Sequence, residues 1–263
     1  MEKKMDNTSV RNQIKSKRSL TVRIAENQYE IEKALTLRYN VFNLEMQEGL
    51  PQSHSTGKDR DEYDRVCDHL IVLDKNTDEV VGTYRILQKS VAESSFGFYS
   101  ENEFDMKSIV QLNCNFAEVG RSCVHPEYRD GSVISLLWAG LGSFMQEKEI
   151  RYLMGCGSLH TTDPLIANRA YAFLKGKSAL AGEEFRVYPK EDFLLPGFRE
   201  DLEFDSVNEL TRFVPPLIKG YVRVGAKVCG FPALDREFKT IDFFLLFDRE
   251  EIDARYGSHY LKQ

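Results

Sequence analysis

The sequence predicts an α/β fold with a mixed, partly antiparallel central sheet flanked by helices. Segments in which apolar and polar residues alternate, as they do in strands, recur through the 263 residues. Other segments place apolar residues at three- and four-residue steps, as amphipathic helices do. The two kinds follow one another without strict alternation, and a chain with that order is expected to form a partly antiparallel sheet.

The composition is that of an ordered globular protein, with 42% hydrophobic and 11% aromatic residues. A net charge of −6 gives no general reason to expect a nucleic acid partner. The five cysteines are scattered and form no pair at CxxC spacing, which predicts reduced thiols in a cytoplasmic protein and no metal site. The N-terminus lacks the apolar core of a signal peptide, and no apolar run approaches the ~20 residues that cross a bilayer.

Residues 1–19 are polar and carry more Lys and Arg than acid, which predicts a mobile basic tail ahead of a single domain over residues 20–263. A basic tail can also be attracted to an anionic membrane surface, by about 1 kcal/mol per charge. Peripheral contact with the inner face of the membrane therefore stays open beside a solvated tail.

Residues 20–24 alternate and predict a first strand. Asn27 and Glu30 then have the spacing of a capping box, so a helix is expected from there to about Met46. Arg38 lies in the middle of the apolar face of this helix. The structural interpretation of such an arginine is a side chain that reaches out to the surface.

A long polar loop is expected over residues 48–68, and long loops in compact domains tend to be functional or disordered. Residues 69–74 and 80–87 are rich in β-formers and predict a hairpin about a polar turn. Arg85, near the end of the second strand, is another arginine within an apolar segment. Residues 94–109 predict a loop with a short helix.

The segment 116–124 predicts a strand that contains two charges, Glu118 and Arg121, in otherwise apolar surroundings. Charged groups in such a place need a partner or a role. A regular pleat puts side chains three positions apart on opposite faces, so the two share a face only if the strand bulges, and Gly120 is a natural site for the bulge. We predict that irregularity; the alternative is an edge strand with two solvated charges.

A helix is predicted to follow, with its apolar face at three- and four-residue steps from Val133 to Met145. The polar loop before it contains Arg129, Gly131 and Ser132. A tight turn at a helix N-terminus suits a phosphate, because the first N–H groups of a helix are unpaired. The alternative is that Gly131 and Ser132 only start the helix.

Toward the C-terminus, residues 152–156 predict a buried strand, and Asp163 before Pro164 predicts the start of a helix that ends near residues 175–177. Residues 188–213 are acidic and irregular. A helix over 217–224 and strands over 225–230 and 240–247 complete the prediction.

Four separated motifs resemble, in order and spacing, the signature of acyl-homoserine-lactone synthases. They are Arg38 with Phe42, residues 61–64 (DEYD), residues 82–85 (GTYR) and residues 118–121 (EVGR). The chain resembles more closely the ornithine lipid N-acyltransferase family, sometimes labelled hemolysin-like, of the GNAT acyltransferase superfamily. This likeness rests on residues 81–85, 98–105, 120–125 and 216–238 and covers about residues 20–250.

The resemblance implies a GNAT-like fold and an enzyme that moves a β-hydroxy fatty acyl group from acyl carrier protein to the α-amine of an amino acid. Ornithine is the expected acceptor, in membrane lipid synthesis. Such a reaction needs a base to deprotonate the amine, and Glu118 is the candidate. The candidate acceptor-binding residues are Arg38, Phe42, Asp61, Asp64, Arg85 and Arg121, with the arginines for the carboxylate. Asp61 and Asp64 would bind a cationic acceptor or else pair with those arginines.

For the donor, the resemblance implies acyl-phosphopantetheine on the carrier protein, with acyl-CoA as the alternative and no bound cofactor. Arg129, Gly131, Ser132 and Val133 are the candidates to bind its phosphate, although this loop is a degenerate version of the acetyl-CoA loop of typical GNAT enzymes. Arg169, Lys175 and Lys177 are candidates for a surface that meets the acidic carrier protein. Their alternative is a solvated helix face.

Two other functions stay open at this point. One is an acyl-homoserine-lactone (autoinducer) synthase, which uses S-adenosylmethionine as the acceptor. The other is a non-enzymatic, membrane-active hemolysin-like protein, although no segment is amphipathic enough to disrupt a bilayer.

Overall fold

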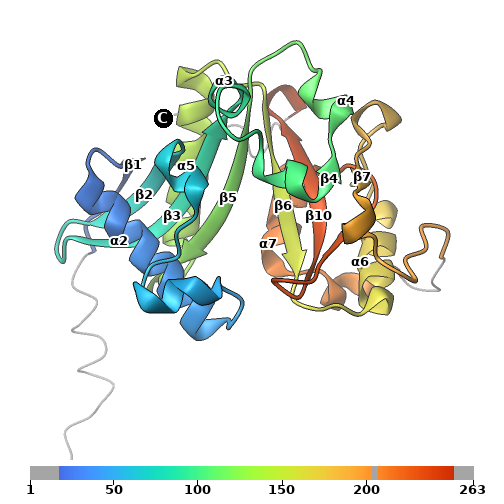
Figure 1. The fold of residues 1–263 in the computed structure, drawn as a ribbon, viewed down its shortest axis with the longest axis horizontal. Coiled ribbons are helices and arrows are strands. Elements are labelled where there is room, and N and C mark those ends of the chain that lie inside the picture. Colours follow the sequence, from blue (N-terminus) through green and yellow to red (C-terminus); the bar gives the residue numbers. More distant parts are fainter. Residues whose placement is uncertain (1–17, 203–206, 252–263) are drawn as a thin grey trace, which may run out of the picture.

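The computed structural model describes residues 18–202 and 207–251, and it contains one large mixed sheet with helices on both faces (Figure 1). The sheet has the strand order β1-β2-β3-β5-β6-β10-β8, and β9 pairs with β10. Its strands are β1 (Leu20–Ile24), β2 (Asp68–Asp74), β3 (Glu79–Gln88), β5 (Phe116–Val124), β6 (Tyr152–Leu159), β8 (Lys227–Val228), β9 (Ala233–Asp235) and β10 (Thr240–Asp248). Among the strands of these residues, β5 and β6 are parallel and the other pairs are antiparallel. The predicted fold class is confirmed.

The helices divide between the two halves of the sheet. They are α2 (Gln28–Arg38), α3 (Lys89–Glu93), α4 (Lys107–Val110), α5 (Ser132–Glu147), α6 (Pro164–Gly176) and α7 (Pro216–Arg223). Side chains of β2 alternate between two cores: Ile71 and Leu73 pack against α2, whereas Leu70 and Val72 pack against α5. The two helices therefore cover opposite faces of the N-terminal half, as Figure 1 shows.

The C-terminal half is arranged in the same way. Ile241, Phe243 and Leu245 of β10 pack with α6 and α7, while Phe244 and Leu246 face the segment that carries α4 and the small sheet of β4 (Phe104–Asp105) and β7 (Tyr188–Pro189). Each half thus has its own two-sided core. None of the helices described is both long and apolar enough to cross a membrane.

The two halves meet where β5 pairs with β6, and this pairing is short. Residues 116–118 pair with residues 152–154, after which the strands diverge (Figure 1). At the point of separation Gly155 lies so close to β5 that a Cβ atom there would overlap the carbonyl oxygen of Val119. From residue 119 onward, the edge of β5 that faces β6 pairs with no strand of the described residues.

Most of the predicted elements are confirmed, but the sequence did not predict α3, β4 or β7, and three further local differences occur. The first helix does start at the Asn27 cap, but after Arg38 it continues as a π-helix (Tyr39–Glu45). The strand β9 was not expected, and β8 is shorter than the strand predicted over 225–230. Of the predicted tail, residues 18 and 19 are described and contact the domain: Arg18 forms an ion pair with Asp130. The other residues of the tail, 1–17, lie outside the described residues.

Candidate active site

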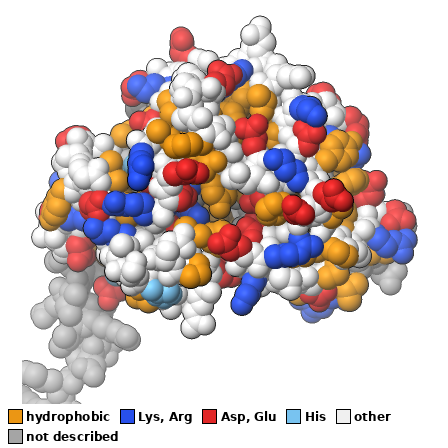
Figure 2. All heavy atoms as spheres, in the orientation of Figure 1, with side chains coloured by type: hydrophobic (Ala, Val, Ile, Leu, Met, Phe, Trp, Pro, Cys, Tyr) orange, Lys and Arg blue, Asp and Glu red, His pale blue; other side chains and the backbone are white. Residues whose placement is uncertain are grey.

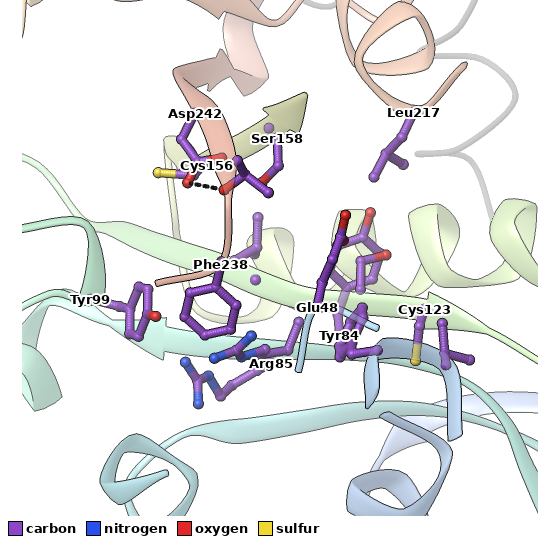
Figure 3. Close-up of a pocket in the computed structure, with 18 of the residues that line it drawn as sticks. Glu48, Tyr84, Arg85, Tyr99, Cys123, Cys156, Ser158, Leu217, Phe238 and Asp242 are labelled. Atoms are coloured by element: carbon purple, nitrogen blue, oxygen red, sulfur yellow. Dashed lines mark hydrogen bonds between the residues drawn. The ribbon is translucent and has the colours of Figure 1, made fainter. Parts of the chain in front are cut away.

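A cleft of about 500 Å³ occupies the space that opens where β5 and β6 diverge. One wall is formed by β3 and β5 and the opposite wall by β6 and β10, with α7 and the π-helix at its sides. Figure 3 shows Asp242, Cys156 and Ser158 on one side of this space and Arg85 on the other, with Tyr99 and Phe238 between them.

A bulge in β5 brings Glu118 and Arg121 into this cleft together. Thr83 pairs with Cys123 and Arg85 pairs with Gly120, so two residues of β5 stand opposite one residue of β3. The predicted irregularity is therefore confirmed. The residue with the left-handed backbone is Arg121 (φ 50°) rather than the neighbouring Gly120, which differs from the expected site.

Glu118 is buried, with 6% of its surface exposed, and its carboxylate is held by the turn that begins at Tyr99. Its Oε2 accepts a hydrogen bond from the backbone N–H of Tyr99 (2.6 Å). Its Oε1 accepts from the backbone N–H (2.8 Å) and the hydroxyl (2.5 Å) of Ser100. Burial raises the pKa of Glu118 above its ordinary value, although these hydrogen bonds act in the opposite direction.

Arg38 does not reach the surface, and the structural interpretation of its sequence position was wrong in that respect. It is 1% exposed and donates to Asp59 (Nε to Oδ2, 2.7 Å) and to both oxygens of Asp64 (2.6 and 3.2 Å). Arg85 donates to Asp61 (2.5 Å) and Asp64 (3.3 Å). The aspartates of the long loop thus pair with the arginines, which was one of the two alternatives for Asp61 and Asp64. Burial would raise the pKa of Asp64, but Arg38 and Arg85 lower it overall.

Arg121 differs from the other two arginines because its guanidinium is not fully paired. Its ion pairs with Asp59 and Asp61 are both 3.8 Å long, and its Nη2 makes no hydrogen bond to any described residue. The guanidinium lies 5.1 Å from the ring centroid of Phe238 and 5.7 Å from that of Tyr99. Arg121, Arg85 and Phe42 line the cleft, whereas Arg38, Asp61 and Asp64 lie behind it. Arg121 is therefore the guanidinium best placed to meet a carboxylate that enters.

Three further carboxyl groups lie in the cleft, and the sequence analysis missed them. Glu103, Asp235 and Asp242, which we call the acidic cluster, are buried and offer oxygens within 4.8 Å of one another. Burial, and then the charges of Asp242 and Asp235, raise the pKa of Glu103 to about 9. Burial also raises the pKa of Asp242, to about 6. An acid within the apolar strand of residues 240–247 is the signal that could have identified Asp242, by the argument used for Glu118.

Replacing Glu103 by Gln is expected to increase the free energy of unfolding near neutral pH by about 3 kcal/mol, because each pKa unit corresponds to about 1.4 kcal/mol. Glu103 is protonated in the folded protein at that pH but ionised in the unfolded chain. The folded state therefore binds one more proton, and the stability of the wild type falls as the pH rises from about 4.5 to about 9. Urea denaturation at about pH 5, 7 and 9 measures this, and a difference between the two proteins that does not grow with pH would contradict it.

The loop before α5 is occupied by its own side chains. Gly131 (φ 95°) is the N-cap of the helix, and Ser132 donates its backbone N–H and its hydroxyl to Asp130 (3.1 and 2.6 Å). Arg129 lines the cleft and forms a two-pronged ion pair with Glu45 (2.5 and 2.8 Å). Val133 is fully buried in the core. Binding of phosphate by this loop stays a prediction.

The three residues expected to meet a carrier protein lie on or just after α6. Arg169 is half-buried over the ring of Phe213, and Lys175 and Lys177 are exposed. None of the three lines the cleft described above. Figure 2 shows acidic and basic side chains interspersed over the face in view, without a large area of one sign. Their role in docking stays a prediction.

Comparison with known proteins gives two kinds of match. A family model described as an acetyltransferase (GNAT) domain matches residues 37–139. Curated relatives with the name L-ornithine N(alpha)-acyltransferase match almost the whole chain. That of Agrobacterium fabrum is 36% identical over 255 residues, which cover 92% of this chain and 85% of the relative. That of Brucella abortus is 33% identical and covers 92% and 89%, and that of Rhodobacter capsulatus is 31% identical and covers 93% and 96%.

Solved structures share the fold at low sequence identity. FeeM, an N-acyl amino acid synthase from uncultured soil microbes, matches with a TM-score of 0.51 and 12% identity, over 89% of this chain and 93% of that chain. The acyl-homoserine-lactone synthase LasI matches with a TM-score of 0.51 and 12% identity, over 92% and 95%. The divergence of β5 and β6 is thus set in a fold of the GNAT type.

Proposed function

The chain belongs to the L-ornithine N(alpha)-acyltransferase family and is an acyltransferase, and on this premise we propose that it transfers a β-hydroxy fatty acyl group from acyl carrier protein to the α-amine of ornithine. The observation that carries the proposal is the bulge in β5, because it turns a buried carboxylate and an incompletely paired guanidinium toward one cleft. A base and a carboxylate-binding group are the two functions that an amino acid acceptor requires.

In the proposed reaction Arg121 binds the carboxylate of the amino acid, and Arg85 adds positive charge behind it. Glu118 accepts a proton from the α-ammonium group, directly or through one water molecule, because the attacking nitrogen needs a free electron pair. The nitrogen forms a bond to the thioester carbon and the carbon–sulfur bond breaks. The bonded nitrogen then loses its second proton to the departing thiolate, and Glu118 releases the first proton to solvent. The raised pKa of Glu118 makes its carboxylate a better proton acceptor than an exposed glutamate.

The open edge of β5 supports a pantetheine thioester as the donor. Beyond residue 118 this edge pairs with no strand in the part of the chain that the structure describes, so its N–H and C=O groups can pair with an extended arm that carries amides. Arg129, Gly131, Ser132 and the backbone of Val133 would meet the phosphate of that arm, which requires Asp130 to release Ser132. Leu217, Ile218 and Tyr221 of α7 offer an apolar wall for the acyl chain.

The acyl carrier protein is proposed to dock against Arg169, Lys175 and Lys177, and the fatty amide that results is amphipathic and suited to a membrane. Association with the inner face of the membrane is part of the same proposal, since it would bring the product to its destination.

The test is an assay of the purified chain with ornithine and either a β-hydroxyacyl carrier protein or the corresponding acyl-CoA, with the products identified by mass spectrometry. The expected product is the N-acylated amino acid, formed faster from the carrier protein. S-adenosylmethionine serves as the comparison acceptor. Formation of an acyl-homoserine lactone instead, or of no amide from either donor, would refute the proposal.

A further inference from the structure

Two oxygens of the acidic cluster lack a hydrogen-bond donor among the described residues, although Oδ2 of Asp242 accepts from the hydroxyl of Thr240 (3.4 Å). Glu103 is 3% exposed and Asp242 is 5% exposed. Within residues 18–202 and 207–251, no N–H or O–H group makes a hydrogen bond of normal geometry to Oε2 of Glu103 or to Oδ1 of Asp242. Both side chains line the cleft. Because a buried acceptor without a donor is unfavourable, these two oxygens are suited to a donor that arrives with a ligand.

Asp235 is placed differently, and its contacts set the shape of the site. Its Oδ1 accepts the backbone N–H groups of Glu237 (2.8 Å) and Phe238 (2.9 Å), which fixes the turn between β9 and β10. The turn places the ring of Phe238 between Asp242 and Arg85 (Figure 3), and the ring lies 5.1 Å from the guanidinium of Arg121. The cleft therefore has carboxylates at one side, guanidinium groups at the other and an aromatic ring between them.

We propose that the acidic cluster binds the side-chain ammonium of a diamino acid and thereby selects ornithine over neutral amino acids of the same shape. This inference rests on the function proposed above. An ammonium group carries one positive charge and three N–H donors, which is one donor for each carboxyl group of the cluster. With its carboxylate at Arg121, such an acceptor lays its methylene groups against Phe238 and reaches Glu103 and Asp242 with its far end.

The charge of the cluster favours a monovalent cation over a divalent metal ion. A proton retained by Glu103 near neutral pH reduces the negative charge of the pair that it forms with Asp242. A divalent ion needs several ionised oxygen ligands, and one oxygen of Asp235 is already occupied by two backbone N–H groups. An ammonium group needs less charge and can use the remaining oxygens as acceptors.

The experiment compares ornithine with norvaline, which has the same carbon chain without the terminal amine. Calorimetry measures the affinity of the full chain for each amino acid, and the acyl-transfer assay gives kcat/KM for each. We expect wild type to prefer ornithine in both, and Asp242→Asn to reduce that preference by about 10- to 100-fold, the effect of a lost charged hydrogen bond. Glu103→Gln serves as the second variant. The ratio of kcat/KM for the two amino acids does not depend on the fraction of the protein that is folded, so a partly unfolded variant still tests the inference.

Asp105→Asn is the matched control, because Asp105 lies two residues from Glu103 but is half exposed and bonds to Lys107 outside the cleft. It should retain the wild-type preference. An unchanged preference in Asp242→Asn and Glu103→Gln, an equal loss of kcat/KM for both amino acids, or a preference that is abolished by a metal chelator would overturn the inference. Selective binding of ornithine without any acyl transfer would refute the proposed function and leave the cation site supported.

Discussion

Replacement of Glu118 by Gln is expected to lower kcat for acyl transfer by about 10²- to 10⁴-fold, the range that acid–base catalysis contributes in enzymes. Gln keeps the size of the side chain and an oxygen that can accept from the turn at Tyr99 and Ser100, but it cannot take a proton from the amine. The wild type should also lose activity as the pH falls through the raised pKa of Glu118, since the base is then protonated. Steady-state rates across pH, with ornithine and acyl carrier protein, measure both effects.

Ser100→Ala distinguishes a role in proton transfer from a role in holding the turn. The hydroxyl of Ser100 lowers the pKa of Glu118, so its removal should shift the acid limb of the pH profile to higher pH while the carboxylate remains. A general base usually contributes more than about a factor of ten to the rate. If Glu118→Gln keeps more than about a tenth of the wild-type kcat, another group removes the proton.

Arg38→Leu is expected to reduce the free energy of unfolding by about 3–5 kcal/mol, the effect of removing one partner from a buried ion pair. Asp59 and Asp64 would stay buried without their shared partner, Asp59 being fully buried. Because Arg38 holds the pKa of Asp64 low, the variant should be most destabilised above the ordinary pKa of aspartate and less so at acid pH, where that carboxylate is protonated. Denaturant titration at neutral and acid pH measures the difference.

The control for this substitution lies beside Asp59, on the loop that pairs with Arg38. Arg60 pairs with Glu32 at the surface, and Arg60→Leu should change the free energy of unfolding by less than about 1 kcal/mol. Adding Asp64→Asn to Arg38→Leu should recover part of the lost stability, since it removes one of the charges left unpaired. A loss in Arg38→Leu no larger than in the Arg60 variant would contradict the assignment of a buried network.

Local patterns predicted most of the fold because they report interactions between near neighbours. The hairpin of β2 and β3, the Asn27 cap and the Asp163 start of α6 depend on residues a few positions apart. Local patterns did not predict the π-helix after Arg38. Its extra residue per turn changes neither the capping residues nor the alternation of apolar and polar residues from which helices and strands were predicted. Arg38 is buried because it pairs with Asp59 and Asp64. These residues lie more than 20 positions away, so the pattern of the helix does not indicate the pairing.

The residues of the site were also predictable only where they are close in the sequence. The bulge could be predicted because Glu118 and Arg121 lie three positions apart in one strand. A regular strand would place them on opposite faces, so a shared face requires a bulge. The acidic cluster draws Glu103, Asp235 and Asp242 from separate segments, and no spacing in the sequence relates them. Their proximity follows from the pairing of β9 with β10 and from the turn that Glu118 holds.

The extra residue in β5 also makes the site sensitive to chain length. Deleting Ser122 would let β5 resume an unbroken pleat against β3, with nearly the same amino acids and the same neighbouring helices. The base and the guanidinium would then emerge on opposite sides of the sheet. An aligned relative that lacks this single position would conserve the fold and still be unable to hold an amino acid beside a proton acceptor.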